Sequence, residues 1–198
     1  MTAQLEVKRL TPQQMLQDLD LFTVKIQALA ERIGLDLSAA QADHIALRIN
    51  ETEIAAQAHQ AWSAYGEVIS LAKINDRPIV VIAFDRPLNS NGWHIECLEL
   101  PYPAPGKSYP NESWEHIEFV IPSMAQTAED YLADLQRQLP VFAERFEQLA
   151  DLGVKVKLSS PKGEGERLNN PTVAFKYDGV CIKLHPHTLK AIVASEQD

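Results

Sequence analysis

The sequence lacks the features that mark several common classes of protein. Its 198 residues contain no apolar run of about 18 residues, the length needed to cross a membrane, and the first residues do not form a secretion signal. Walker, Rossmann, G-x-S-x-G and paired C-x-x-C motifs are absent, so the sequence gives no support to those chemistries. A net charge of −9 argues against nucleic acid or an anionic membrane surface as a partner. We therefore expect a small-molecule ligand and a monomer or homodimer.

Cysteine is also scarce. The only two, Cys97 and Cys181, lie far apart, each in an apolar segment typical of a strand. Without a secretion signal, this pattern favours two buried reduced thiols over a disulfide. It predicts a cytoplasmic protein.

The remaining composition, 45% hydrophobic and 23% charged, is ordinary for a globular protein. We expect a single domain over residues 1–198, in which an amphipathic segment at 12–34, one long helix or a helical pair, precedes two modules at 43–100 and 114–186. Hydrophobic periodicity and turn signals predict the order β-α-β-β-β in each module. For module one the predicted elements are strand 43–49, helix 51–66 and strands 67–74, 78–84 and 93–100. For module two they are strand 115–121, helix 123–150 and strands 154–158, 171–177 and 180–185, followed by a closing helix at 187–195. The fold class is α+β.

Each module begins with a similar strand that carries a histidine. Residues 42–49 read A-D-H-I-A-L-R-I and residues 114–121 read W-E-H-I-E-F-V-I. Because side chains alternate along a strand, each strand has an apolar face and a polar face. The polar faces carry His44 and Arg48 in the first strand, His116 and Glu118 in its repeat, and Cys181, Lys183 and His185 in the last strand.

Imidazole and carboxylate groups from separate strands suit a divalent ion such as Zn²⁺, Mn²⁺, Fe²⁺ or Ni²⁺. A histidine on a strand is, however, more often hydrogen-bonded or exposed than a ligand, and this alternative stays open. In the charged loop 159–170, Lys162 and Arg167 are candidates to contact an anionic ligand. A simple solvated loop is the alternative.

These segments resemble the vicinal-oxygen-chelate superfamily, which includes glyoxalase I, methylmalonyl-CoA epimerase and extradiol dioxygenases. Within it the chain is similar to the YecM-like family over nearly its full length, through strings such as Y-P-N-E-S-W-E-H-I-E, S-S-P-K-G-E-G-E-R-L-N-N-P-T and I-K-L-H-P. The resemblance implies that the two modules form a cupped mixed sheet with a metal at its centre. It also implies His44, Glu99 and His116 as metal ligands.

The resemblance fails at the fourth ligand. Lys183 stands where the superfamily usually has a glutamate, and His185 follows two residues later on the same face. Three alternatives follow: His185 is the fourth ligand, the site has three protein ligands, or the metal has been lost. We expect Glu118 to move a proton and Arg48, Lys162, Arg167 and Lys183 to contact substrate. Two functions stay open, a metal-dependent isomerase, lyase or dioxygenase acting on a small oxygenated substrate, and a non-catalytic small-molecule binding protein.

Overall fold

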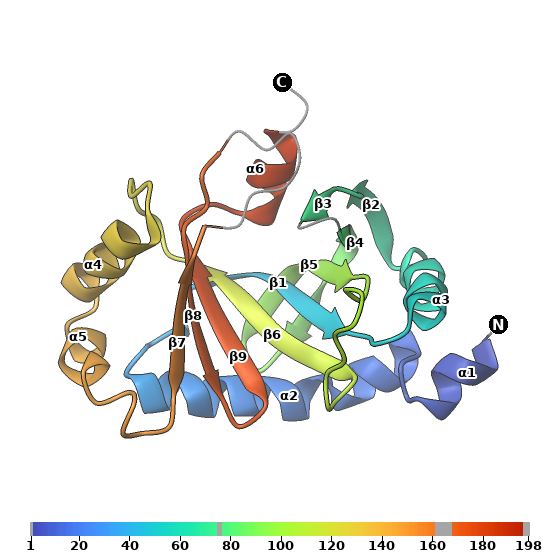
Figure 1. The fold of residues 1–198 in the computed structure, drawn as a ribbon, viewed down its shortest axis with the longest axis horizontal. Coiled ribbons are helices and arrows are strands. Elements are labelled where there is room, and N and C mark those ends of the chain that lie inside the picture. The colour runs from blue at the N-terminus through green and yellow to red at the C-terminus, as the bar shows by residue number, and fades with distance from the viewer. Residues whose placement is uncertain (1, 75–76, 161–167, 196–198) are drawn as a thin grey trace.

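A computed structural model gives the fold and describes residues 2–74, 77–160 and 168–195 (Figure 1). Two modules, in which helices and strands follow one another in the same order, make up most of the fold. Module one contains β1 (Gln41–Arg48), α3 (Thr52–Trp62), β2 (Gly66–Ser70), β3 (Lys73–Ile74), β4 (Arg77–Ser90) and β5 (Trp93–Pro101). Module two contains β6 (Ser113–Val120), α4 (Ala128–Gln138), α5 (Pro140–Phe146), β7 (Lys155–Ser159), β8 (Thr172–Tyr177) and β9 (Val180–His185), followed by α6 (Leu189–Ala194).

All the strands belong to one mixed sheet. Its order is β2-β4-β5-β1-β6-β9-β8-β7, with β3 paired to β4 outside this path. The first strands of the modules, β1 and β6, pair antiparallel at the centre, and each runs parallel to the last strand of its own module. Counted inward from the two edges of the sheet, the strand orders β2-β4-β5-β1 and β7-β8-β9-β6 are therefore equivalent. This confirms the predicted α+β fold of two β-α-β-β-β modules.

The N-terminal segment forms α1 (Thr2–Val7) and one long helix, α2 (Pro12–Ile33). A capping box between Thr11 and Gln14 begins α2, and Gly34, with a φ of 75°, ends it. The helix lies across β4, β6 and β9 (Figure 1). Its apolar stripe is buried against the sheet, through Met15, Leu19, Phe22, Ile26, Leu29 and Ile33. The prediction of a helix over 12–34 is confirmed, as one helix rather than a pair.

Two hairpin turns follow the sequence closely. Asp178 and Gly179 join β8 to β9 with φ values of 47° and 79°, and Asn91 and Gly92 join β4 to β5 with 47° and 89°. Positive φ at both central residues is the backbone of a type I′ turn, which Asn-Gly and Asp-Gly favour. These turns set the pairing of the two strands that carry Glu99 and Lys183.

The predicted helix over 123–150 was wrong, because the chain forms two helices there. Thr127 caps α4 by accepting a hydrogen bond from the Asp130 backbone N–H, and α4 ends at Gln138, before Leu139. Leu139 has a φ of −125° and a ψ of 82° and directly precedes Pro140. A proline disfavours the helical conformation in the residue before it, so α5 begins anew at Pro140.

Several other predicted bounds shift. Gly66 does not end the expected helix 51–66, which stops at Trp62, but begins β2. A Cβ at position 66 would lie 2.0 Å from the carbonyl oxygen of Ala83 on β4, so only glycine fits this close strand pairing. The predicted strand 67–74 divides into β2 and β3, and β4 extends past residue 84 to Ser90. The closing helix is shorter than 187–195, since Thr188 caps it.

Candidate metal centre

The two repeated histidines lie side by side at the centre of the sheet. The pairing of β1 with β6 sets His44 opposite Glu118 and His116 opposite Ala46. The two rings have centroids 6.3 Å apart, and both residues are 2% exposed. Each histidine also faces a cysteine on its parallel neighbour, His44 with Cys97 and His116 with Cys181. The duplicated strands thus bring both imidazoles into one buried region.

The acid before each histidine lies at an irregularity in the strand pairing. Ala42 pairs with Phe119 and His44 pairs with Glu118, which leaves Asp43 of β1 without a partner across the ladder. A second register shift in the same ladder leaves Glu115 of β6 unpaired in the same way. A bulge residue escapes the strict alternation of faces. Both acids can therefore turn toward the histidine that follows them.

These two carboxylates orient the imidazoles. Asp43 Oδ2 lies 2.8 Å from Nδ1 of His44, and Glu115 Oε2 lies 3.1 Å from Nδ1 of His116. An Nδ1–H that donates to a carboxylate fixes the tautomer, so the lone pair of the neutral ring is on Nε2. Both Nε2 atoms point into the same space, toward Glu118.

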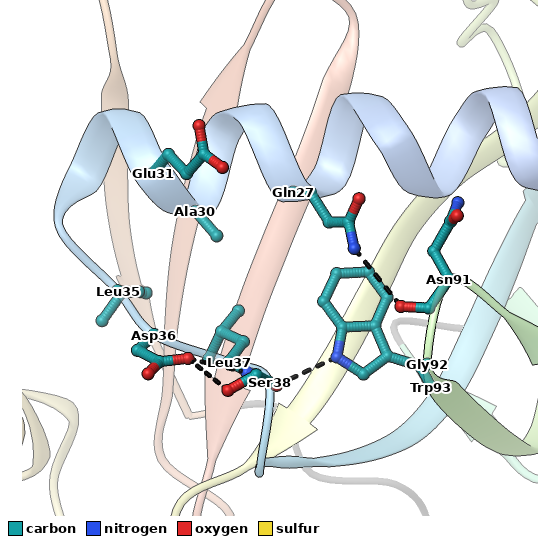
Figure 2. A pocket seen from close by; sticks show the side chains of 10 residues that line it. All are labelled: Gln27, Ala30, Glu31, Leu35, Asp36, Leu37, Ser38, Asn91, Gly92 and Trp93. Carbon is teal, nitrogen blue, oxygen red and sulfur yellow. Dashed lines mark hydrogen bonds between the residues drawn. The ribbon is translucent and has the colours of Figure 1, made fainter.

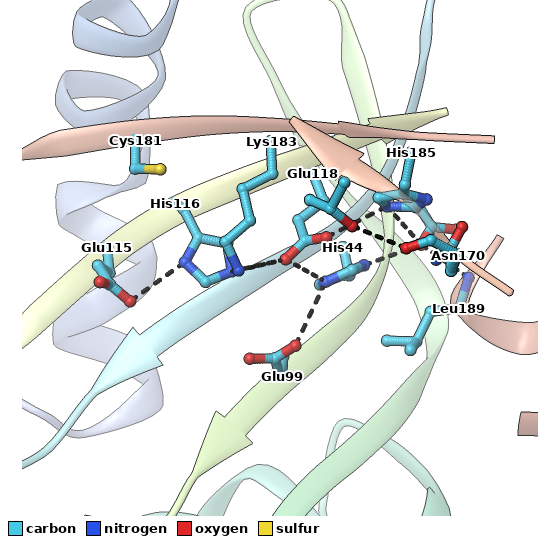
Figure 3. A network of polar contacts seen from close by, with 12 residues as sticks. His44, Glu99, Glu115, His116, Glu118, Asn170, Cys181, Lys183, His185 and Leu189 are labelled. Atoms are coloured by element: carbon cyan, nitrogen blue, oxygen red, sulfur yellow. Dashed lines mark hydrogen bonds and ion pairs between the residues drawn. The ribbon is translucent and has the colours of Figure 1, made fainter. Parts of the chain in front are cut away.

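Glu118 occupies the middle of the cluster (Figure 3). Its Oε1 lies 3.0 Å from Nε2 of His116 and 3.2 Å from Nε2 of His44, while Oε2 lies 3.3 Å from Nε2 of His185. The Lys183 ammonium donates to Oε1 at 2.7 Å. Burial opposes ionisation of Glu118, but the Lys183 charge and the two histidines outweigh it and hold its pKa well below 4.5. The carboxylate is therefore ionised and in contact with four cationic or imidazole groups.

His185 approaches the cluster from the end of β9. Its Nδ1 lies 2.6 Å from the carbonyl oxygen of His187, so this nitrogen carries the proton and Nε2 carries the lone pair. Nε2 lies 3.8 Å from Oδ2 of Asp43, and the His185 ring stacks on His44 with centroids 5.7 Å apart. Burial is the main cause of its lowered pKa. His185 is thus a neutral imidazole, and its lone-pair nitrogen, Nε2, faces the carboxylates of Glu118 and Asp43.

Lys183 and Glu99 are the more open members of the cluster. The side chain of Lys183 is 28% exposed and that of Glu99 is 16% exposed, and Glu99 Oε2 lies 3.5 Å from Nε2 of His44. Burial raises the pKa of Glu99, but His44 and Lys183 overcome this and lower it to about 2. Burial likewise opposes the charge on Lys183, but Glu118 and Glu99 raise its pKa above the usual value. Both groups are charged at neutral pH, and both are partly accessible to solvent.

Arg48 lies one step further from the centre. Its guanidinium pairs with Glu115, the carboxylate that also orients His116, and stacks over Tyr109 at 4.2 Å from the ring centroid. The Arg48 side chain is 12% exposed. This placement gives Arg48 a positioning role through Glu115 and does not by itself indicate contact with a ligand.

The structure brings together most of the residues that the sequence singled out. His44, Glu99, His116 and Glu118 offer ligand atoms that all lie within 4.8 Å of one another. His185 is not in that group, and instead forms a second group with Asp43 and His44. Lys162 and Arg167 lie outside the described residues. Sequence reasoning missed Asp43 and Glu115 as site residues, although the acid-histidine pair in both repeats was the available signal.

The donor set fits a divalent cation. For ligands about 2.1 Å from an ion, neighbouring donor atoms are separated by about 3.0 Å in an octahedron and about 3.4 Å in a tetrahedron. The contacts of Glu118 with the three histidines, at 3.0 to 3.3 Å, have these separations. Nε2 of His44 and Nε2 of His185 are buried and have no hydrogen-bond partner. Nε2 of His44 faces the carboxylates of Glu118 and Glu99, and Nε2 of His185 faces Glu118, so a cation bound there would contact imidazole and carboxylate together.

A separate hollow of about 330 Å³ lies between the end of α2 and the β4–β5 turn (Figure 2). It borders Trp93, which packs on Phe119 on the face of the sheet away from His116. The indole N–H of Trp93 donates to the carbonyl of Leu37 at 2.9 Å, and the Gln27 amide donates to the carbonyl of Asn91 at 3.3 Å. These polar groups already have partners, so the hollow offers less chemistry than the histidine cluster.

Known proteins resemble this chain over almost its whole length. A family model described as YecM protein matches residues 11–196. Protein YecM of Escherichia coli (strain K12) is 38% identical over 185 residues, which cover 93% of this chain and 94% of that protein. A solved structure described as Structural Genomics, Protein EC4020, superposes with a TM-score of 0.73 at 34% identity, over 96% of this chain and 93% of that one. Methylmalonyl-CoA epimerase from Mycobacterium tuberculosis gives a TM-score of only 0.44 at 14% identity, over 81% of this chain and 98% of that one, too weak to carry an argument.

Proposed function

The chain belongs to the YecM protein family, and we propose that it is a metal-dependent enzyme of the vicinal-oxygen-chelate type. It would act on a small oxygenated anion as an isomerase, lyase or dioxygenase. One observation carries this proposal. Three imidazoles, each with Nδ1 held by an oxygen atom, direct Nε2 toward the single carboxylate of Glu118. Purely structural histidines have no need of such convergence.

The electrostatics of the cup support a divalent ion. Four carboxylates and two permanent cations lie in or beside the cluster: Asp43, Glu99, Glu115, Glu118, Arg48 and Lys183. Burial lowers the pKa of His44, but Glu118 and Asp43 outweigh it and raise that pKa well above 6.5, so a metal bound to His44 would displace a proton. With that proton displaced, two negative charges are in excess in a buried region, where unpaired charge is costly. One divalent cation neutralises them. His44 is shared by two groups of possible ligands, one completed by Glu99, His116 and Glu118 and the other by Asp43 and His185. Oε2 of Glu118 lies 3.3 Å from Nε2 of His185, so it also reaches the second group.

A bound divalent ion would supply Lewis acidity to an oxygen atom of the ligand. The chain's own residues supply the rest. The Lys183 ammonium is partly exposed and would bind an anionic oxygen of the ligand. Glu118 is enclosed by Lys183 and the three histidines. This placement favours a role in binding the metal ion over the proton transfer expected from the sequence.

Glu99 is the better candidate to accept a proton. It is ionised, it is partly accessible to solvent, and its only described ion-pair contact is with His44. A carboxylate next to a bound carbonyl compound can take a proton from the neighbouring carbon. We assign this role to Glu99 and the anchoring of the ligand to Lys183.

A metal binding measurement tests the first half of the proposal. Protein purified without a histidine tag, then dialysed and analysed for metal, should retain close to one equivalent of a divalent transition metal. The Co²⁺-loaded protein should show visible absorption that changes when oxalate, a small anion with two adjacent oxygen donors, is added. His44→Gln should abolish both signals, whereas His94→Gln, a change at an exposed histidine on β5, should leave them intact. Retention of metal in His44→Gln would reject the site.

Proton exchange tests the catalytic half. The metal-loaded protein is incubated in D₂O with small 2-oxo and 2-hydroxy carboxylates. NMR then follows loss of the hydrogen signal from C3, next to the ketone, in the 2-oxo compounds and from C2, which bears the hydroxyl, in the 2-hydroxy compounds. We expect exchange with the native protein and at least a 100-fold slower rate with Glu99→Gln.

A non-catalytic binding protein is the second candidate function, and the Lys183 ammonium favours it. The Lys183 ammonium, which stands where the superfamily usually has a carboxylate, can bind an anion without catalysing a reaction of that anion. Oxalate binding without exchange of any tested compound would support this alternative.

A further inference from the structure

The cup contains two adjacent groups of ligand atoms that share His44. The first comprises His44, Glu99, His116 and Glu118. Its members His44, Glu99 and His116 are the three ligand positions that the superfamily resemblance implies. The second comprises Asp43, His44 and His185. In the described part of the chain, only one of the two already contains a lysine ammonium.

The Lys183 ammonium is that cation. Its Nζ lies 2.7 Å from Oε1 of Glu118 and 3.1 Å from Nε2 of His116. With Nδ1 of His116 bound to Glu115, Nε2 is the ring's free lone pair, and the ammonium donates into it. A metal in the first group would have to displace Lys183 from both atoms.

The strand registers show that Lys183 occupies the position in module two that Glu99 occupies in module one. Glu99 follows two residues after Cys97, the partner of His44, and Lys183 follows two residues after Cys181, the partner of His116. Residues two apart on a strand share a face. Module two therefore presents an ammonium at the position where module one presents a carboxylate, and the superfamily's four-ligand arrangement does not fit this chain.

The second group has no lysine ammonium bound to it in the described part of the chain, and it has unsatisfied atoms. Six buried side-chain polar atoms in the described part of the chain have no hydrogen-bond partner, and three of them are Oδ1 of Asp43, Nε2 of His44 and Nε2 of His185. These three residues are at most 2% exposed. Nε2 of His185 also lies 3.3 Å from Oε2 of Glu118, the oxygen that Lys183 does not contact. Figure 3 shows Glu118 between the two, with His116 and Lys183 on one side and His185 on the other.

We propose that the divalent cation of the cup is held by Asp43, His44, His185 and Oε2 of Glu118, and that Lys183 permanently replaces a metal in the neighbouring group. Glu118 then bridges an ammonium and a metal ion, with one oxygen for each. Two carboxylates and neutral imidazole are suitable ligands for Zn²⁺, Mn²⁺, Fe²⁺ or Co²⁺. The inference rests on the proposed function, since it locates the ion of that same cup. It also leaves Glu99 and Lys183 free to contact the ligand.

Two matched substitutions separate the two positions. His185→Gln removes a ligand of the second group, and Glu99→Gln removes a ligand of the first, with little change in volume. Tag-free native protein and both variants are dialysed against Mn²⁺ or Zn²⁺, and bound metal is measured by mass spectrometry. We expect about one equivalent in the native protein and in Glu99→Gln, and at least a tenfold loss of affinity in His185→Gln. Asp43→Asn should behave like His185→Gln, and thermal unfolding without metal verifies that each variant is folded.

The other outcomes are equally informative. Loss of metal in Glu99→Gln with retention in His185→Gln would overturn the shifted position and leave the proposed function standing. Two equivalents in the native protein, one of them lost in His185→Gln, would support the second position and overturn the claim that Lys183 replaces a metal. No metal in the native protein would overturn both the inference and the metal-dependent function.

Discussion

At the scale of single residues, the acid that precedes each histidine is the feature on which the site most depends. Alternation along a strand would place Asp43 and Glu115 on the face opposite their histidines. The unpaired position of each acid in the β1–β6 ladder allows it instead to contact Nδ1 of the next residue. The sequence shows the repeated acid-histidine pair, but a bulge is a property of two strands together and cannot be read from one.

Glu115 should therefore matter for stability as well as orientation. Glu115→Gln leaves the Arg48 guanidinium without its charged partner in a setting where Arg48 is only 12% exposed. We expect a loss of about 2 kcal/mol in the free energy of unfolding, measured with urea. Glu96→Gln, which removes the partner of the half-exposed Lys190, should cost no more than about 0.5 kcal/mol. Equal losses in the two variants would contradict the assigned role of Glu115.

Lys183 provides a second test at this scale. Lys183→Met removes the ammonium from Glu118 and His116, which should destabilise the metal-free protein by about 3 kcal/mol. The same change frees the first group of ligands, so the variant should bind a second divalent ion, as measured by calorimetric titration. Lys190→Met, at a lysine paired with Glu96 outside the cluster, serves as the control. An unchanged stoichiometry in Lys183→Met would show that the ammonium does not exclude a metal.

At the scale of elements, α2 is the main support of the sheet on the face away from the histidines. Ile26 is fully buried in its stripe, whereas Leu21 on the same helix is 71% exposed. Ile26→Ala should lower the free energy of unfolding by about 3 kcal/mol, because it leaves a cavity beneath the sheet. Leu21→Ala should change it by less than about 0.5 kcal/mol. If both variants unfold at the same urea concentration, the helix is not packed as described.

The N-terminal helix is attached through an ion pair that should respond to acid. Lys8 Nζ lies 2.7 Å from Glu112 and 2.8 Å from Glu51, and Glu112 also accepts a hydrogen bond from the Asn50 backbone N–H. Burial raises the pKa of Glu112, but these two donors outweigh it and lower the pKa below 4.5. A carboxyl whose pKa is lowered by folding stabilises the protein above its unfolded value and loses that effect as the pH falls through the folded value.

Glu112→Gln tests this attachment. At pH 7 the variant should be less stable than the native protein by about 1 kcal/mol. The difference should shrink as the pH falls below the unfolded value of about 4.3 and through the lowered folded value, because the native carboxyl then becomes protonated. Urea unfolding at a series of pH values measures it, and a difference that does not change with pH would contradict the ion pair.

The element scale also shows where sequence reasoning succeeds and fails. The β-α-β-β-β order, the helical segment at 12–34 and the two hairpin turns follow from hydrophobic periodicity, caps and Asp-Gly or Asn-Gly pairs, all of which are local. The choice between one helix and a pair over 12–34 did not follow from them. The break before Pro140 was missed because the apolar pattern continues across it, although the proline itself was the signal. Gly66 was misassigned because its role depends on the approach of Ala83 from another strand.

At the scale of the whole molecule, duplication of one module explains both the site and its departure from symmetry. Equivalent strands meet at β1 and β6 and bring His44 and His116 together, as the repeat in the sequence predicts. The partition of the cluster into two groups was not predictable, because it depends on which oxygen of Glu118 faces Lys183 and which faces His185. No helix in the described part of the chain is long and apolar enough to span a membrane.

The most direct test of the account is a crystal structure of the tag-free protein loaded with Mn²⁺ or Zn²⁺, with data collected at the absorption edge of the metal. We expect one anomalous peak in the cup, about 2.1 Å from a carboxylate oxygen of Glu118 and from Nε2 of His185. A peak bonded to Glu99 and His116 would contradict the shifted position. An ordered cup with no peak at saturating metal would contradict the central claim that these histidines and carboxylates form a metal centre.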